Sequence, residues 1–298
     1  VVSEAASQQT GIPAGIPVIA CGSDKGCETI GTGVVNDRMA SLSFGTTATV
    51  QTTTRTYFEP LRFMPPYPAA IPDHYNPEIE IFRGYWLITW FKEEFAHQEV
   101  LEAEKKGVLP EVVMNNLLSE VPPGSMGLMV QPFWGPGLKH PWAKGAMIGF
   151  GDVHRKAHVY RAVIEGLGYA LLDGLHKMEK AGKFRVEKVA VSGGASQSDE
   201  ICHITADIFN LPLVRGTTHE SSGLGAAVVT SVGVGIHPSF DAAIEKMVRY
   251  ETVFEPNSVN VPLYARLYER VYQKMYDSLA PLYREIREIT DYPEKSVW

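Results

Sequence analysis

The chain has 298 residues, 45% of them hydrophobic and 20% charged, which is typical of a folded globular protein of one or two domains and excludes a disordered, collagen-like or coiled-coil chain. Its formal net charge of −7 argues against nucleic acid as a partner. The longest apolar-rich stretch, residues 223–236, is too short to cross a bilayer, so no membrane partner is predicted.

The first third of the chain predicts five elements in order: a buried strand, a short helix, a β-hairpin, a proline-rich irregular loop and one long helix. These elements span residues 17–22, 26–35, 39–53, 55–78 and 85–106, respectively. The hairpin is rich in Thr, Val and Ser and turns at residues 45–47. Six prolines between residues 55 and 78 exclude the interior of a regular element there.

The rest of the chain predicts two short strands and a long helix, followed by alternating strands and helices. The predicted strands are residues 126–132, 145–150, 186–192, 213–215 and 250–254. The predicted helices are residues 153–180, with Gly182 as C-cap, and 196–210, 222–234, 241–248 and 262–279. In the last helix, Tyr264, Tyr268, Tyr272 and Tyr276 form a stripe that predicts packing on a sheet. Pro281 is expected to interrupt the helix, which we expect to resume to about residue 289.

Cysteine and histidine positions give no metal site. The chain has three cysteines, Cys21, Cys27 and Cys202, and their spacing matches no zinc site. Because an odd number of cysteines cannot all pair, we predict reduced thiols and a cytoplasmic location. His154 and His158 lie four residues apart without the Glu of a zinc-protease motif. Because the chain starts without Met and has no signal-peptide pattern, we interpret it as part of a longer polypeptide.

Three glycine-containing turns are candidates for chemistry. Residues 193–198 join a strand to a helix, where free N–H groups favour an anionic ligand, although such a turn is often only a tight connection. Residues 43–47 place Gly and two Thr at a hairpin tip and suit a phosphate, although an ordinary β-turn is an equal alternative. In residues 22–24, Asp24 is either a general base or the N-cap of the next helix.

Taken in chain order, these turns and their neighbours resemble the second half of the FGGY family of carbohydrate kinases. The most specific stretch is residues 145–150 followed, after seven residues, by residues 158–165, which is similar to the second signature of the family. Four further segments resemble the catalytic Asp loop, the phosphate-binding hairpin, the adenosine-binding turn and the segment after that turn. They are residues 22–24, 43–47, 191–196 and 220–227, and the tail 247–268 also matches.

The resemblance implies an α/β chain with the actin-like, ribonuclease-H-like fold and ATP bound between two domains. Residues 1–38 then correspond to the end of the first domain, with the Asp loop, and residues 39–298 to the second, nucleotide-binding domain. The Asp-x-Gly-Thr segment that opens the first domain is not found in this sequence. The missing first domain is therefore an expected partner within the same polypeptide, and the face it would cover predicts self-association of this chain, for example as a homodimer.

The implied activity is transfer of the γ-phosphoryl group of ATP to a hydroxyl of a small sugar or polyol. Asp24 is the implied base and Lys25 a substrate-side residue. The nucleotide-binding residues implied are Gly45, Thr46, Thr47, Gly193, Gly194, Gln197 and Ser198. Mg²⁺ is implied as cofactor, held mainly by the missing domain, so this chain is expected to be inactive alone. The alternative is a nucleotide-binding module without catalysis.

Some residues depart from the family pattern. Lys25 stands where Gln or Asn is usual, and Phe150 where a smaller aliphatic residue is usual. Tyr85 and Thr89 stand where glycerol kinases have Gly and Gln near the nucleotide. A ketopentose such as xylulose or ribulose is therefore favoured over glycerol.

Overall fold

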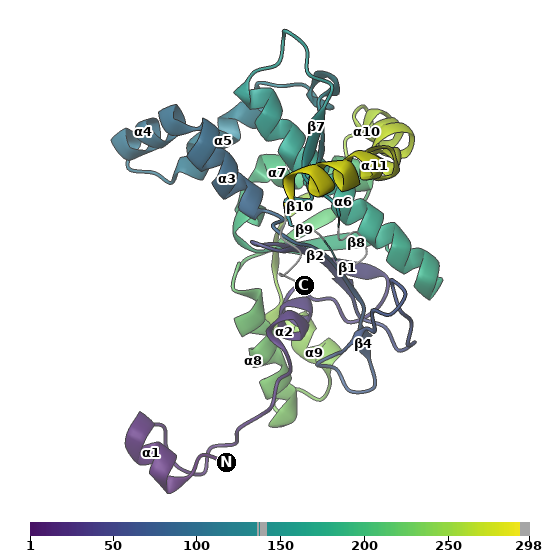
Figure 1. Cartoon of the computed structure of the whole chain (residues 1–298). Coiled ribbons are helices and arrows are strands. Elements are labelled where there is room, and N and C mark those ends of the chain that lie inside the picture. Colours follow the sequence, from purple (N-terminus) through teal and green to yellow (C-terminus); the bar gives the residue numbers. More distant parts are fainter. Residues whose placement is uncertain (136, 138–141, 293–298) are drawn as a thin grey trace.

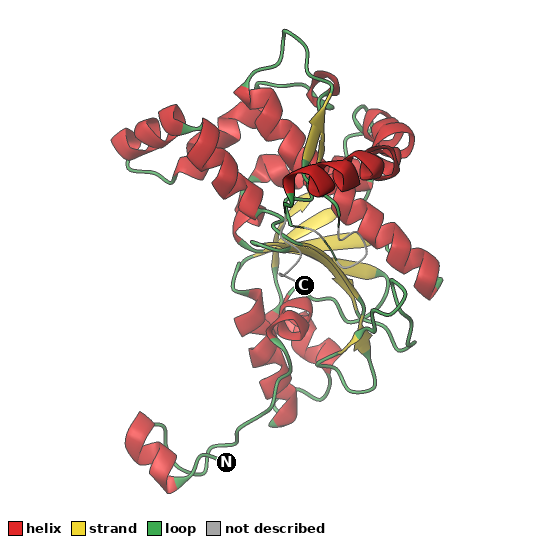
Figure 2. Ribbon diagram, viewed as in Figure 1, coloured by secondary structure: helices red, strands yellow, loops and turns green. Residues whose placement is uncertain are grey.

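A six-stranded mixed sheet forms the centre of the molecule (Figures 1 and 2). The structure, a computed structural model, describes residues 1–135, 137 and 142–292; residues 293–298 of the second predicted domain lie outside the described residues. The strand order is β10-β9-β8-β1-β2-β5, with β1, β8 and β9 parallel and the other strands antiparallel to their neighbours. These strands are β1 (Met39–Phe44), β2 (Ala48–Thr52), β5 (Glu78–Ile81), β8 (Lys188–Ser192), β9 (Leu213–Gly216) and β10 (Tyr250–Phe254).

Helices cover both faces of this sheet (Figure 1). One face packs on α6 (Lys156–Gly182) and α7 (Asp199–Phe209), and the other on α2 (Asp24–Gly31), α8 (Ser221–Gly233) and α9 (Phe240–Met247). Side chains alternate between the two faces of a strand. On β1, Leu42 therefore joins the apolar core under α6, whereas Ser41 and Ser43 face α2 and bond to its side chains.

The predicted hairpin and the alternating strands and helices are confirmed, but the N-terminal half differs in several elements. Residues 17–22 form no strand; they are extended and mostly exposed, because no neighbouring strand of the described chain pairs with them. The helix predicted over 85–106 is two helices that meet at Ala96, and a further helix follows them that the pattern did not predict. Besides α2, the α-helices of this half are α1 (Glu4–Thr10), α3 (Trp86–Phe95), α4 (His97–Lys106) and α5 (Pro110–Ser119).

Two short pairs of strands lie outside the central sheet. The first lies within the predicted proline-rich loop, and the second confirms the strands predicted over 126–132 and 145–150. β3 (Tyr67–Pro68) pairs with β4 (Tyr75–Asn76), and β6 (Met129–Gln131) pairs with β7 (Ala146–Ile148). The proline-rich segment thus ends in two-residue strands and leads directly into the edge strand β5. The sequence did not predict β5.

The C-terminal helices form one continuous rod against α6. They are α10 (Val261–Leu267), a π-helical turn (Tyr268–Tyr272) and α11 (Gln273–Thr290). Tyr264, Tyr268 and Tyr272 are buried, and their rings lie 5.3–6.3 Å from the ring of Tyr169 on α6. These tyrosines are therefore packing residues, but the predicted partner was wrong: they pack on a helix and not on a sheet.

Two predicted helix features were wrong. Pro281 lies inside α11 without interrupting it, although the helix ends at Thr290, close to the predicted end near residue 289. Gly182 is the last residue of α6, and the C-cap is Lys183 in the left-handed conformation, with φ of 56°. No helix within the described ranges is long and apolar enough to cross a membrane.

A buried ion pair connects α6 to the segment before β6. Glu165 is 1% exposed and accepts hydrogen bonds from Arg161 Nε (2.9 Å), the Tyr264 hydroxyl (2.8 Å), the Ser125 hydroxyl (2.8 Å) and Gly124 N (2.9 Å). Burial raises the pKa of Glu165, although Arg161 and these donors oppose the rise. The acid that ends the second signature-like stretch therefore has a structural role.

Candidate active site

Two of the predicted turns lie side by side at the carboxyl ends of β1 and β8. These strands are parallel neighbours, with Ser43 opposite Ser192 in register. The hairpin tip 45–47 and the Gly193–Gly194 turn follow these two serines directly. Thr46 is exposed and Thr47 half-buried, so hydroxyl and N–H groups of the hairpin tip are accessible next to the second turn. Ligands bind at such strand ends in open α/β sheets.

Gly193 and Gly194 differ in what surrounds them. Gly193 has φ of +86°, and a Cβ there would lie 2.8 Å from the carbonyl carbon of Phe44. The fold therefore requires glycine at residue 193. A Cβ at Gly194 would meet no atom within 4 Å, and Gly194 is exposed. Open space thus lies above a backbone that a planar ligand can approach closely.

The third turn presents Asp24 at the start of α2. The helix begins at Asp24, and the N-cap is Ser23, whose hydroxyl accepts from Gly26 N at 3.0 Å. Asp24 is therefore not the cap, which was one of the two alternatives from the sequence. Its side chain is exposed, and its carbonyl oxygen accepts from the Ser222 hydroxyl at 3.3 Å. Its carboxylate remains accessible to a substrate.

Helix α2 crosses α8 at very short range because of two glycines. A Cβ on Gly31 would lie 1.8 Å from Ser221 O, and a Cβ on Gly225 would lie 1.8 Å from Cys27 O. The two backbones therefore touch, and no other residue fits at either position. This contact fixes α2, and with it Asp24, on the body of the sheet.

A hydrogen-bonded network joins α2 to the carboxyl ends of β1 and β8, next to the two turns. Lys25 Nζ donates to Glu28 Oε2 (2.7 Å) and to the Ser43 hydroxyl (3.0 Å), and the Ser192 hydroxyl donates to Glu28 Oε1 (2.6 Å). Burial raises the pKa of Glu28, but the hydrogen bonds from Lys25 and Ser192 outweigh it and hold the pKa below its ordinary value. Glu28 is therefore a carboxylate at neutral pH.

This network includes Glu28 and Ser192, which the sequence did not single out. The signal for Glu28 was its i, i+3 spacing from Lys25 on a predicted helix. Lys25, the predicted substrate-side residue, instead lies half-buried and turned toward the strand ends. The three predicted turns and Lys25 thus meet around the carboxyl ends of β1 and β8.

Two other predicted nucleotide-side residues differ in accessibility. Gln197 is exposed at the end of a 3-10 turn, Gly194–Gln197. Ser198 is buried, and its hydroxyl caps α7 by accepting from Ile201 N at 3.3 Å. The Ser198 side chain therefore serves the helix start.

The described residues do not by themselves make a metal site. Within them, no three or more His, Cys, Asp or Glu side chains are grouped so as to hold an ion. His154 Nδ1 accepts from Gly151 N at 2.8 Å, and His158 Nδ1 accepts from Arg155 N at 3.1 Å. The accessible backbone of residues 45–47 and 193–194, by contrast, suits the phosphates and base of a nucleotide.

Sequence comparisons place this chain beside carbohydrate kinases. The profile of the FGGY family of carbohydrate kinases, C-terminal domain, matches residues 40–234. An uncharacterised sugar kinase, YgcE, of Escherichia coli K12 is 31% identical over 265 residues, covering 88% of this chain and 54% of that protein. A xylulose kinase of Staphylococcus epidermidis is 30% identical over 271 residues, which cover 88% of this chain and 52% of that protein. This chain thus spans about half the length of these relatives.

Solved structures show the same fold. The ligand-bound xylulose kinase of Lactobacillus acidophilus aligns with a TM-score of 0.82 at 22% identity, over 95% of this chain and 56% of that one. The xylulose kinase of Rhodospirillum rubrum aligns with a TM-score of 0.80 at 24% identity, with the same coverages. The predicted actin-like, ribonuclease-H-like α/β fold is therefore confirmed. The profile match, the relatives and this fold together show that the chain belongs to the FGGY family of carbohydrate kinases.

Proposed function

We propose that the protein containing this chain is an ATP-dependent carbohydrate kinase that phosphorylates a hydroxyl of a small sugar or polyol. The observation that supports this most is the convergence of three turns, residues 22–24, 45–47 and 193–194, at the ends of two parallel strands. They supply an accessible acid, a hydroxyl-bearing hairpin and an open glycine turn. Phosphoryl transfer needs a base, phosphate positioning and a nucleotide seat.

Each turn has a separate role in this proposal. Asp24 takes the proton from the acceptor hydroxyl. Gly45, Thr46 and Thr47 position the phosphates through hydroxyl and N–H groups. Gly194 seats the adenosine on open backbone, with exposed Gln197 beside it, while Gly193 holds the turn against β1. Lys25 and Glu28 hold α2 to both turns, which keeps Asp24 at a constant position relative to the phosphates.

The rest of the active site is assigned to a first domain of the same polypeptide. The chain spans about half of its relatives, and we retain the boundary near residue 38 as part of this proposal. The described residues contain no group of three or more His, Cys, Asp or Glu side chains that could hold an ion, and we assign the Mg²⁺ that ATP brings mainly to that domain and to the phosphates. A cytoplasmic location is part of the same proposal.

For the substrate, we propose a ketopentose, with xylulose favoured. Xylulose kinases recur among the relatives and among the structures with this fold. Relatives of similar identity include an autoinducer-2 kinase of Salmonella typhimurium, at 27%. The test is a panel of D-xylulose, D-ribulose and glycerol with the full-length protein, scored by ADP release.

The role of Asp24 is tested by Asp24→Asn in the full-length protein. Removing a positioned base should lower the phosphoryl-transfer rate by about 10² or more while leaving ATP affinity near normal. Single-turnover kinetics measures the first quantity and calorimetry the second. An unchanged rate would show that Asp24 is not the base. Absence of transfer by the unaltered full-length protein would instead favour the alternative of a nucleotide-binding module without catalysis.

A further inference from the structure

One half of the sheet face that carries α2 is polar, although it is largely buried. Thr49 and Gln51 of β2 lie opposite Glu80 and Glu78 of β5 in the antiparallel register. Thr49, Gln51 and Glu78 are 2%, 3% and 6% exposed. The Thr29 hydroxyl of α2 donates to Gln51 Oε1, so α2 covers β2 but not β5. The two glutamates lie beyond the edge of α2, on the last strand of the sheet.

Glu78 has a buried acceptor that nothing satisfies. Its Oε1 is inaccessible and has no hydrogen-bond partner among the described residues, and the same holds for Asn76 Oδ1, two residues before it. Burial, and then the charge of Glu80, raise the pKa of Glu78 to about 7, although Gln51 and Lys25 act in the opposite direction. Unsatisfied buried acceptors cost about 1–3 kcal/mol each. Such groups persist where a ligand or water supplies the missing donor.

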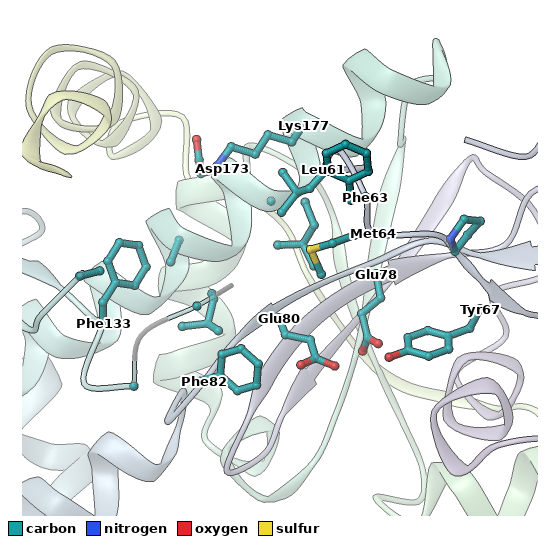
Figure 3. A pocket seen from close by; sticks show the side chains of 18 of the residues that line it. Leu61, Phe63, Met64, Tyr67, Glu78, Glu80, Phe82, Phe133, Asp173 and Lys177 are labelled. Atoms are coloured by element: carbon teal, nitrogen blue, oxygen red, sulfur yellow. Dashed lines mark ion pairs between the residues drawn. The ribbon is translucent and has the colours of Figure 1, made fainter. Parts of the chain in front are cut away.

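These acids line a cavity of about 630 Å³ along β5. Figure 3 shows the Glu78 and Glu80 side chains pointing the same way, with the Tyr67 hydroxyl directed at Glu78 and the Phe82 ring beside Glu80. This end of the cavity combines carboxylates with aromatic rings. Hydroxyl groups of a sugar donate to carboxylates, while its C–H faces pack on rings.

The acidic end of the cavity borders the Asp24 turn. A Cβ at Gly22 would lie 3.2 Å from Ala70 Cβ, and one at Gly26 would lie 3.7 Å from Ala70 N, so the segment that follows Tyr67 touches the turn on both sides of Asp24. Lys25, next to Asp24, is close enough for its charge to act on Glu78. A small molecule held at Asp24 is therefore within reach of β5.

We infer that Glu78 and Glu80, flanked by Tyr67, form an acceptor-rich subsite that binds hydroxyl groups of the sugar whose phosphorylation by Asp24 is proposed above. This inference rests on the proposed function and extends it to a specificity determinant. The ligand chemistry is a neutral polyol, since its hydroxyls supply the donor that Glu78 Oε1 lacks. Glu78 and Glu80 bind substrate and take no part in the proton transfer.

The test compares Glu80→Gln and Glu78→Gln in the full-length protein with the unaltered protein, using D-xylulose, D-ribulose and glycerol. Losing a charged acceptor should raise the KM for the preferred sugar by about 10-fold or more. The KM for ATP should stay within about two-fold, because the nucleotide turns lie at other strand ends. The matched control is Glu104→Gln on the exposed face of α4, which should change neither KM.

Monodeoxy analogues of the preferred sugar separate binding from a structural effect. For the analogue that lacks the contacted hydroxyl, the KM of the unaltered protein and of the Glu80→Gln variant should converge, because the interaction is then absent from both. Two outcomes would overturn the subsite alone. One is a sugar KM that is equal in the variants and the unaltered protein. The other is a KM change in the variant that is the same for every analogue and is accompanied by a lower melting temperature of the variant. Absence of turnover by the unaltered protein with all three sugars would overturn the proposed function and the subsite with it.

Discussion

Gly193 and Gly194 are adjacent, but substitution at each should have a different effect. In the full-length protein, Gly194→Val should leave the melting temperature nearly unchanged, since open space surrounds its Cβ, and should weaken ATP binding. Gly193→Ala should instead lower the free energy of unfolding by roughly 1–3 kcal/mol, because φ is +86° and the backbone of Phe44 is in the way. Calorimetric titration with ATP and thermal unfolding measure the two effects. Normal ATP affinity in Gly194→Val would remove this turn from the nucleotide site.

Glu28 and Glu78 should affect stability in opposite directions as pH changes. The pKa of Glu28 is held below its ordinary value of 4.5, so its contribution is present above pH 4.5 and is lost as pH falls through the lowered pKa. The pKa of Glu78 is raised to about 7, so the folded state binds its proton more tightly than the unfolded state does. Stability therefore falls as pH rises from 4.5 to about 7.

Denaturant unfolding at several pH values tests these two opposite effects of pH on the free energy of unfolding. Glu78→Gln should flatten the change in unfolding free energy between pH 4.5 and 7, and Glu28→Gln should flatten it below pH 4.5. A Glu78→Gln profile parallel to that of the unaltered chain would contradict the raised pKa.

Glu165→Ala should be among the most destabilising single changes in the chain. It would leave Arg161, which is 8% exposed, as a buried charge without its carboxylate, and would remove the acceptor of Gly124 N and the Ser125 hydroxyl. Breaking a buried pair in this way costs about 3–5 kcal/mol. Urea unfolding measures the loss, and Glu104→Ala, on an exposed helix face, is the control. A loss below about 1 kcal/mol would mean that water replaces the carboxylate.

The sequence predicted the residues of the turns better than the residues that connect them. Asp24, Thr46 and Gly194 belong to short local patterns that are visible in one stretch of chain. Glu28 bonds to Ser192, which lies 164 positions away, and this contact depends on how β8 sits beside β1. The pairing of Glu78 with Gln51 likewise depends on strand register, which no local pattern contains.

At the scale of elements, the contact between α2 and α8 should tolerate no Cβ. Gly31→Ala and Gly225→Ala should each lower the free energy of unfolding by more than about 1 kcal/mol, since helix backbones would have to separate. Gly223→Ala is the matched control on the same helix: no atom lies within 4 Å of its Cβ, so it should be neutral or should stabilise by about 0.5–1 kcal/mol. Equal effects of the three changes in urea unfolding would show that the glycines act only through helix propensity.

Helices and strands were predicted correctly where the sequence of the segment itself determines its secondary structure. The hairpin 39–53 and the strands β8 and β9 have alternation and glycine boundaries of their own. The apolar run 17–22 has strand composition, but pairing requires a neighbouring strand, and none in the described chain lies beside it. Pro281 was expected to interrupt a helix, yet α11 runs through it, because burial of Ala280 and Tyr283 on either side outweighs one lost hydrogen bond.

At the scale of the whole molecule, residues 1–298 should fold but not turn over sugar. The core spans elements from β1 to the C-terminal rod, and its size is sufficient for an independent domain. Catalysis depends on groups held on both sides of a cleft, and this chain supplies one side in our proposal. A coupled ADP-release assay with D-xylulose should show turnover only for the full-length protein, while calorimetry should detect weak ADP binding by this chain. Robust turnover by this chain alone would contradict the two-domain proposal.

The backbone contact between α2 and α8 also determines which parts can move together. Asp24 is the first residue of α2, and the backbone of α2 contacts that of α8. Asp24, the hairpin tip 45–47 and the turn 193–194 are therefore expected to move as one unit. Ile19 and Cys21 also pack on α8, and residues 15 and 16 bond to Val2. Pro17 and Val18, exposed between these contacts, are where a pivot would lie (Figure 1). Rotation about this pivot would leave the distance from Asp24 to the phosphate-binding turns unchanged. In our proposal, closure of a first domain would then bring the sugar to Asp24 and to phosphate-binding turns whose spacing is already set.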